Sequence, residues 1–121
     1  MAQKRPEQSP ERMLKFNRLL RGYLDAQGHN DAWLARKTGL SKTTISRMVQ
    51  NRDYRGRCYY PTVKSVIAVC LALKITEEQR WELFHLVFPE WEIYREAMTG
   101  GYSVALTNEM LEEAHLPTLT D

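Results

Sequence analysis

The sequence predicts an all-α protein. Apolar residues recur at helical spacing in several segments, capping residues stand where these segments begin, and glycine or proline stands where they end. The chain has 121 residues, of which 43% are hydrophobic and 26% charged, and it contains no internal repeat and no low-complexity segment. These values suit one compact domain with a buried core.

The first helix is expected between Ser9 and about Gln27. Ser9 is a good N-cap, Pro10 occupies a position where its missing amide donor is harmless, and Gly28 ends the segment. An apolar stripe along the segment predicts that this helix packs into the core. The stripe consists of Met13, Phe16, Leu19, Leu20, Tyr23 and Leu24.

Residues 30 to 51 read as two short helices joined by a tight turn. Asn30 caps the first helix, and Gly39 ends it in the left-handed conformation that glycine adopts at little cost. Ser41 caps the second helix, and Asn51 can close it. The inward positions of the second helix are Thr44, Ile45, Met48 and Val49. Its outward positions are Lys42, Thr43, Ser46, Arg47 and Gln50.

Two further helices complete the predicted core. Pro61 and Thr62 open the first, around which apolar residues stand on almost every side, so the whole helix is assigned to the core. Its apolar residues are Val63, Val66, Ile67, Cys70, Leu71 and Leu73. The sequence from Thr76 to Gln79 is a capping box that starts the second helix, and Pro89 stops it.

The C-terminal part is predicted to be helical and is rich in aromatic residues. A short helix is expected from about Trp91 to Met98, with a break at residues 99 to 101, and a last helix is expected to begin at Thr107. Aromatic side chains are enriched at interfaces, so this region could bind a second copy or another protein. The alternative is one extended core that the last two helices cover. The aromatic residues are Trp81, Phe84, Phe88, Trp91, Tyr94 and Tyr102.

The net charge of +2 conceals a division along the chain. Residues 1 to 60 contain thirteen Lys or Arg and five Asp or Glu, which gives +8, and residues 61 to 121 contain four and ten, which gives −6. A basic half attracts phosphate groups because their counterions are released on binding. The alternative is a solvated surface on which the charges are segregated by chance.

The sequence predicts no metal site, no membrane span and no enzyme. Cys58 and Cys70 are expected to be reduced thiols, and together with His29, His85 and His115 they lack the spacing of zinc ligands. No apolar run approaches the roughly 18 to 20 residues of a membrane span, and a cytoplasmic protein is expected. No serine stands in a nucleophile turn and no carboxylates pair in an apolar setting, so no catalytic residue and no cofactor are predicted.

The pattern of residues 34 to 46 resembles the helix-turn-helix of the lambda-repressor-like family, the Cro and phage-repressor type also called XRE. The family carries a Leu-Ala pair, a turn glycine, a small-residue cap and an Ile-Ser pair. The matching residues are Leu34-Ala35, Thr38-Gly39-Leu40-Ser41 and Thr44-Ile45-Ser46. The resemblance implies a five-helix, lambda-repressor-like DNA-binding domain at residues 9 to 88, followed by a C-terminal helical extension at residues 89 to 121.

The resemblance also implies a role for individual residues. The helix that starts at Ser41 would enter the major groove of double-stranded DNA and read bases with its first three residues and one a turn later. By register these residues are Lys42, Thr43, Thr44 and Arg47. Lys42 and Arg47 suit guanine O6 and N7, and the methyl group of Thr43 suits thymine. Phosphate contacts are expected from Asn30 with the amides that follow it, and from Gln50, Arg52, Arg55 and Arg57.

Three features around the motif leave alternatives open. A flexible basic arm at residues 1 to 8, with Lys4 and Arg5, could follow a DNA groove or stay in solvent. In the loop at residues 51 to 61, arginines could clamp phosphates over tyrosine rings, or the loop could anchor its tyrosines in the core. Asp31 stands where the family often has a phosphate-binding glutamine, and its carboxylate would repel DNA at close range.

The predicted function is sequence-specific binding of double-stranded DNA in transcription control, with repression in a bacterium, its phage or a mobile element as the expected role. A single module buries only about 600 to 1,000 Å² on DNA, so a homodimer on two half-sites is expected. The alternative is a protein-interaction module, such as an antitoxin, antirepressor or adaptor. Such a module would use the helix-turn-helix as a scaffold and bind its partner through the C-terminal half.

Overall fold

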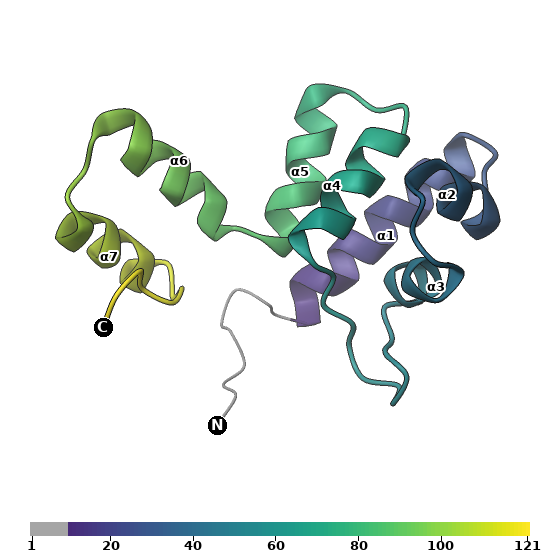
Figure 1. Ribbon diagram of the computed structural model, residues 1–121, viewed down its shortest axis with the longest axis horizontal. Coiled ribbons are helices and arrows are strands. Elements are labelled where there is room, and N and C mark those ends of the chain that lie inside the picture. The colour runs from purple at the N-terminus through teal and green to yellow at the C-terminus, as the bar shows by residue number, and fades with distance from the viewer. Residues whose placement is uncertain (1–9) are drawn as a thin grey trace.

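The computed structural model describes residues 10–121 and is all-helical over that range, with seven helices (Figure 1). The all-α class predicted from the sequence is confirmed. The expected arm at residues 1 to 8 and the expected cap Ser9 lie outside the described residues. The helices are α1 (Pro10–Ala26), α2 (Asp31–Thr38), α3 (Lys42–Gln50), α4 (Val63–Ala72), α5 (Glu77–Val87), α6 (Glu90–Gly100) and α7 (Val104–Glu113).

Side-chain caps define the beginnings of the inner helices. The Ser41 hydroxyl accepts the N–H of Thr44 at the start of α3. Thr76 and Gln79 form the reciprocal capping box predicted for α5, and Thr62 caps α4. Each cap satisfies an amide that has no partner within its own helix and contributes about 1 kcal/mol.

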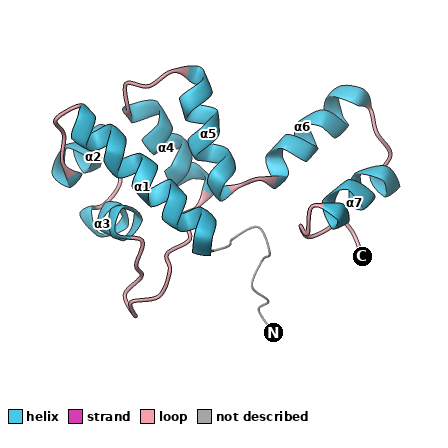
Figure 2. Cartoon of the chain, turned by 180° about the vertical axis from the view of Figure 1, so that it is seen from behind, coloured by secondary structure: helices cyan, strands magenta, loops and turns pink. Residues whose placement is uncertain are grey.

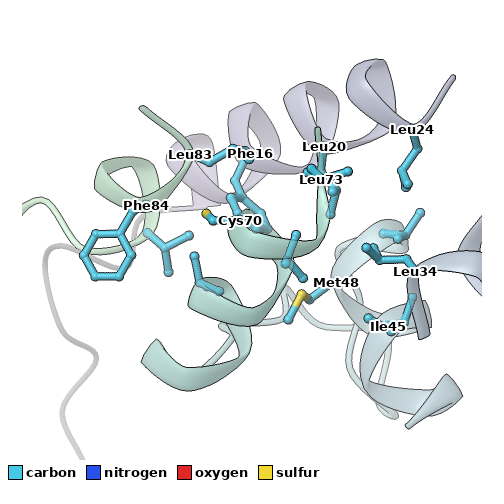
Figure 3. Close-up of a cluster of buried hydrophobic side chains, with 14 of the residues drawn as sticks. Phe16, Leu20, Leu24, Leu34, Ile45, Met48, Cys70, Leu73, Leu83 and Phe84 are labelled. Carbon is cyan, nitrogen blue, oxygen red and sulfur yellow. The ribbon is translucent and has the colours of Figure 1, made fainter. Parts of the chain in front are cut away.

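Helices α1 to α5 share one hydrophobic core (Figure 3). α1 contacts α3 and α5, α4 contacts α2 and α5, and α2 contacts α3. Complete burial of a large apolar side chain stabilises the fold by about 1.5 to 3 kcal/mol. The largest completely buried side chains of this core include Phe16, Leu20, Leu34, Ile45, Met48 and Leu83.

The prediction that α4 is apolar core on every side is wrong at two positions. Ile67 is 42% exposed and Leu71 is 72% exposed, whereas Val66 and Val69 are completely buried. The neighbours of α4 are α2 and α5, which cover only part of its circumference. The apolar composition of the helix therefore exceeds what the core requires.

Helices α6 and α7 extend away from the α1–α5 bundle (Figures 1 and 2). α6 contacts α5 and α7, and among the helices of residues 10–121 α7 contacts α6 alone. The last two helices therefore do not cover the core of α1 to α5, and the alternative of one extended core is not what the chain forms. α6 leads away from the bundle, and α7 folds back along α6.

The predicted start of the last helix at Thr107 is wrong. α7 begins at Val104 because Ser103 is its N-cap, and the Ser103 hydroxyl accepts the N–H of Leu106. Thr107 lies buried inside the helix, where its hydroxyl donates to the Ser103 carbonyl at 2.9 Å. The preceding helix also runs further than predicted, to Gly100, and ends at Gly101 in the left-handed conformation.

Candidate nucleic-acid interface

Residues in the left-handed conformation end both α2 and α3, the two short helices that a tight turn joins. Gly39 has φ of 77°, and its N–H donates to the Ala35 carbonyl at 2.9 Å, which ends α2. Asn51 has φ of 56° and closes α3, with its N–H donating to the Arg47 carbonyl. An asparagine tolerates this conformation better than most residues do. The turn and both ends therefore follow the sequence prediction.

The inner face of α3 is held from two sides. Ile45 and Val49 are completely buried in the core. The side-chain amide of Asn17, on α1, donates to the Val49 carbonyl and lies 3.4 Å from that of Met48. The carbonyls in the last turn of a helix have no partner within it, so Asn17 supplies a donor there. α3 is thus fixed to α1 by a polar contact as well as by packing.

The outer face of α3 presents the predicted DNA-reading residues around a shallow hollow of about 360 Å³. Among the predicted base contacts, Lys42, Thr43 and Arg47 line it, and among the predicted phosphate contacts, Gln50 and Arg52 do. Ser46 also lines it, although it was not among the predicted contacts. Its place one turn after Lys42 and Thr43 is the signal that identifies it.

The remaining predicted contacts lie outside this hollow. Thr44 is half-buried, and its hydroxyl accepts that of Ser41 at 2.9 Å, so its nearest role is at the cap. Asn30 caps α2, where its side-chain oxygen accepts the N–H of Trp33 at 2.9 Å. Its amide nitrogen and the first amides of α2 are the groups that can still donate outward. Asp31 is half-buried in the first turn of the same helix.

A tyrosine after α3 connects that helix to the following loop. Tyr54 is 71% exposed, and the guanidinium carbons of Arg55 and Arg47 lie 5.3 and 5.9 Å from its ring centroid. Cations within about 6 Å of an aromatic face are attracted to it by roughly 0.5 to 1 kcal/mol at exposed sites. Arg47 is therefore positioned by a ring outside its own helix.

Asp53 organises the loop that carries the arginines. Its side chain accepts the N–H groups of Arg55 and Arg57 at 2.8 and 2.9 Å, and the guanidinium of Arg57 at 3.2 Å. Desolvation opposes ionisation, but these hydrogen bonds outweigh it and hold the pKa of the Asp53 carboxyl below its ordinary value. Arg57 consequently faces a carboxylate, whereas Arg52 and Arg55 carry the more available charges.

The end of the loop is anchored to the core. Tyr59 and Tyr60 are partly buried against the core, and the Cys58 thiol donates to the side-chain oxygen of Asn51 at 3.4 Å. Burial and the contact with Cys58 raise the pKa of Tyr60 to about 12. The expectation that the loop anchors its tyrosines in the core therefore holds for Tyr59 and Tyr60, whereas Tyr54 stays exposed beside the arginines. Phosphate binding by the loop arginines stays a prediction.

Two other features, a metal cluster and a membrane-spanning helix, are not found in residues 10–121. Within that range no group of three or more His, Cys, Asp or Glu is arranged to hold a metal ion, and no helix has the length and apolarity that crossing a membrane requires. Cys58 and Cys70 are free thiols, as predicted. In comparisons with protein-family models, curated proteins and solved structures, no match to this chain was found. The interface must therefore be judged on its own chemistry.

Proposed function

We propose that the protein is a sequence-specific regulator that binds double-stranded DNA with α3 in the major groove, most simply as a repressor. The observation that carries the proposal is the outer face of α3. It combines two cations, Lys42 and Arg47, with polar Thr43, Ser46 and Gln50 on a helix whose opposite face is buried. A helix of this kind, held at its ends by a turn and a cap, is what a major groove admits.

The proposed roles follow from donor chemistry. Lys42 and Arg47 donate to guanine O6 and N7, and the Thr43 methyl group contacts thymine. A base contact by Thr44 stays a prediction. Its hydroxyl already accepts a hydrogen bond from the Ser41 cap, so it is less available to a base than the other three side chains. Phosphates are bound by the N-terminus of α2 and by a second set of side chains. These are Asn30, Gln50, Arg52, Arg55 and Arg57.

The charge distribution supports this orientation. The half of the chain that contains α1, α2, α3 and the arginine loop carries +8, and the other half carries −6. A positive field confined to the side of α3 favours approach of the phosphate backbone in that orientation. The five successive helices α1 to α5 around one core support the proposed resemblance to the lambda-repressor-like family.

The proposed active form on DNA is a homodimer. A single module of this size covers too little DNA for high specificity, and two copies would read half-sites about one helical turn apart. Sedimentation of the protein with and without DNA tests this part. A monomer in both cases at micromolar concentration would remove the dimer from the proposal.

The experiment that tests DNA binding is a fluorescence-anisotropy titration with random duplex DNA over a range of salt concentrations. Neutralisation of three to five phosphates predicts a log–log slope of about −3 to −4.5. Arg52→Ala should reduce that slope by about one. Arg95→Ala is the matched control, because Arg95 is an exposed arginine on α6 in the acidic half of the chain, and it should leave the slope unchanged. Weak binding without a salt dependence would contradict the proposal.

A second candidate function is a protein-interaction module of the antitoxin, antirepressor or adaptor kind. The exposed apolar side chains on α4, α5 and α6 favour it. This reading predicts little affinity for duplex DNA at any salt concentration. The same titration therefore separates the two functions.

A further inference from the structure

An apolar groove lies where α4, α5 and α6 meet. It has a volume of about 410 Å³, and its walls come from Ile67 and Leu71 of α4, Trp81 and Phe84 of α5, and Trp91 of α6. Leu71 is 72% exposed, and Trp81 and Trp91 are each 42% exposed. A contiguous apolar patch of this kind on a surface marks a binding site more often than scattered apolar residues do.

The aromatic walls of the groove support one another. The Phe84 ring meets those of Trp81 and Trp91 edge to face, with centroids 5.8 and 5.6 Å apart. Phe84 itself is only 5% exposed, so the two tryptophans stand on a buried base. The Trp81 ring also has the guanidinium carbon of Arg95 at 6.0 Å and the centroid of the His85 ring at 5.5 Å from its own centroid. The groove is therefore already shaped in the free chain.

The groove has an acidic margin. A second hollow of about 480 Å³ shares Glu77 and Trp81 with it and continues along α5 to the start of α6. Four exposed glutamates and two arginines, Arg80 and Arg95, line the two hollows, so negative charge is in excess. The guanidinium of Arg80 already donates to the Ile75 carbonyl. The glutamates are Glu77, Glu78, Glu82 and Glu92.

The charges decide between possible occupants. A second copy would bring the same patch onto itself about a two-fold axis, so the glutamates of both copies would face one another. A small ligand would need convergent polar groups to orient it, and the charged groups of the lining are only Glu77 and Arg80, beside the buried Cys70 thiol and two indole N–H groups. A basic partner with apolar anchors complements both the groove and its margin.

We propose that this groove binds an amphipathic helical segment of another protein, with apolar side chains in the groove and Lys or Arg facing the glutamates. Helix-in-groove recognition uses anchors at every third or fourth position. None of the groove residues belongs to α2 or α3. The groove therefore lies apart from the proposed DNA-reading face of α3.

The test uses the full chain and three labelled synthetic peptides in anisotropy titrations. The first peptide has leucines at every third or fourth position and lysines elsewhere. The second has the same composition in an order without an apolar face, and the third keeps the leucine pattern but replaces lysine with glutamate. We expect the first peptide to bind about tenfold more tightly than either control, and its affinity to weaken at high salt.

Variants locate the binding site. Leu71→Ser should weaken binding of the first peptide by about tenfold, because an anchor contact is lost. Met98→Ser, which changes an apolar side chain that is 85% exposed outside the groove, should leave binding unchanged. Glu77→Gln combined with Glu92→Gln should weaken binding severalfold and reduce its salt dependence.

Three outcomes overturn the proposal. The first is equal binding of the first two peptides, and the second is unchanged affinity of the Leu71→Ser variant for the first peptide. The third is a wild-type dimer that Leu71→Ser dissociates, because that result would assign the groove to a second copy. Titration of Leu71→Ser with duplex DNA should match that of the wild type. If the wild type does not bind duplex DNA, the proposed function is contradicted, but the peptide result still tests the groove.

Discussion

Asn17 provides a direct test of how the fold positions α3. Its side-chain amide is the polar contact between α1 and the last turn of α3, with Val49 as the close acceptor and Met48 at 3.4 Å. Asn17→Ala removes the donor and leaves partly buried carbonyls without it. We therefore expect this substitution to weaken both the fold and the attachment of α3.

The magnitude follows from two opposing effects. Loss of a hydrogen bond that leaves a partly buried acceptor unpaired costs about 1 to 2 kcal/mol. Alanine has the higher helix propensity, which returns about 0.5 kcal/mol. The net loss of unfolding free energy is therefore about 1 kcal/mol, and the melting temperature should fall by roughly 4 °C for a chain of this size.

Urea unfolding followed by circular dichroism measures this difference. Arg18→Ala, an exposed neighbour on the same helix, is the control and should change stability by less than about 0.5 kcal/mol. Asn17→Asp should lower the unfolding free energy more than Asn17→Ala does at neutral pH, because it places a carboxylate against carbonyl oxygens. Hydrogen exchange should accelerate selectively in the last turn of α3. Equal stability of Asn17→Ala and Arg18→Ala would refute the reasoning.

Three further predictions concern the turn, the DNA approach and pH. Gly39→Ala should lower the unfolding free energy by about 1 to 2 kcal/mol in urea titrations, because φ of 77° is unfavourable for alanine. Asp31→Gln should tighten binding of duplex DNA in anisotropy titrations; no gain would mean that the start of α2 does not approach phosphate. Burial raises the pKa of Cys70 to about 11, so the unfolded chain ionises first and stability should fall as pH rises from about 9 to about 11. Cys70→Val should reduce that fall.

Local signals made the helix ends of the inner bundle predictable. Ser41 and Thr76 each cap an amide three residues later, so the evidence for these caps is contained in a few neighbouring residues. Helical spacing placed Lys42, Thr43 and Arg47 on one face for the same reason. The start of α7 was missed because Thr107 resembles a cap, although Ser103 supplies the actual one.

Long-range contacts could not be predicted in this way. Asn17 meets carbonyls 31 and 32 residues away, which no local pattern indicates. The apolar pattern of α4 does not reveal which side its neighbours leave uncovered, so the exposure of Leu71 was unexpected. Likewise, the sequence offered Tyr54 as either an anchor or a partner for arginine, and only the fold distinguishes these roles.

The most direct measurement of the central claim is the affinity of a Lys42→Ala, Arg47→Ala double variant for a duplex selected from a random library by the wild type. Two specific base contacts, each worth about 1 to 3 kcal/mol, predict a dissociation constant raised by at least about thirtyfold. Circular dichroism should show a folded variant whose melting temperature falls by no more than about 4 °C, because Lys42 is exposed and Arg47 loses only its contact with the Tyr54 ring. An undiminished affinity in a folded variant would contradict the account.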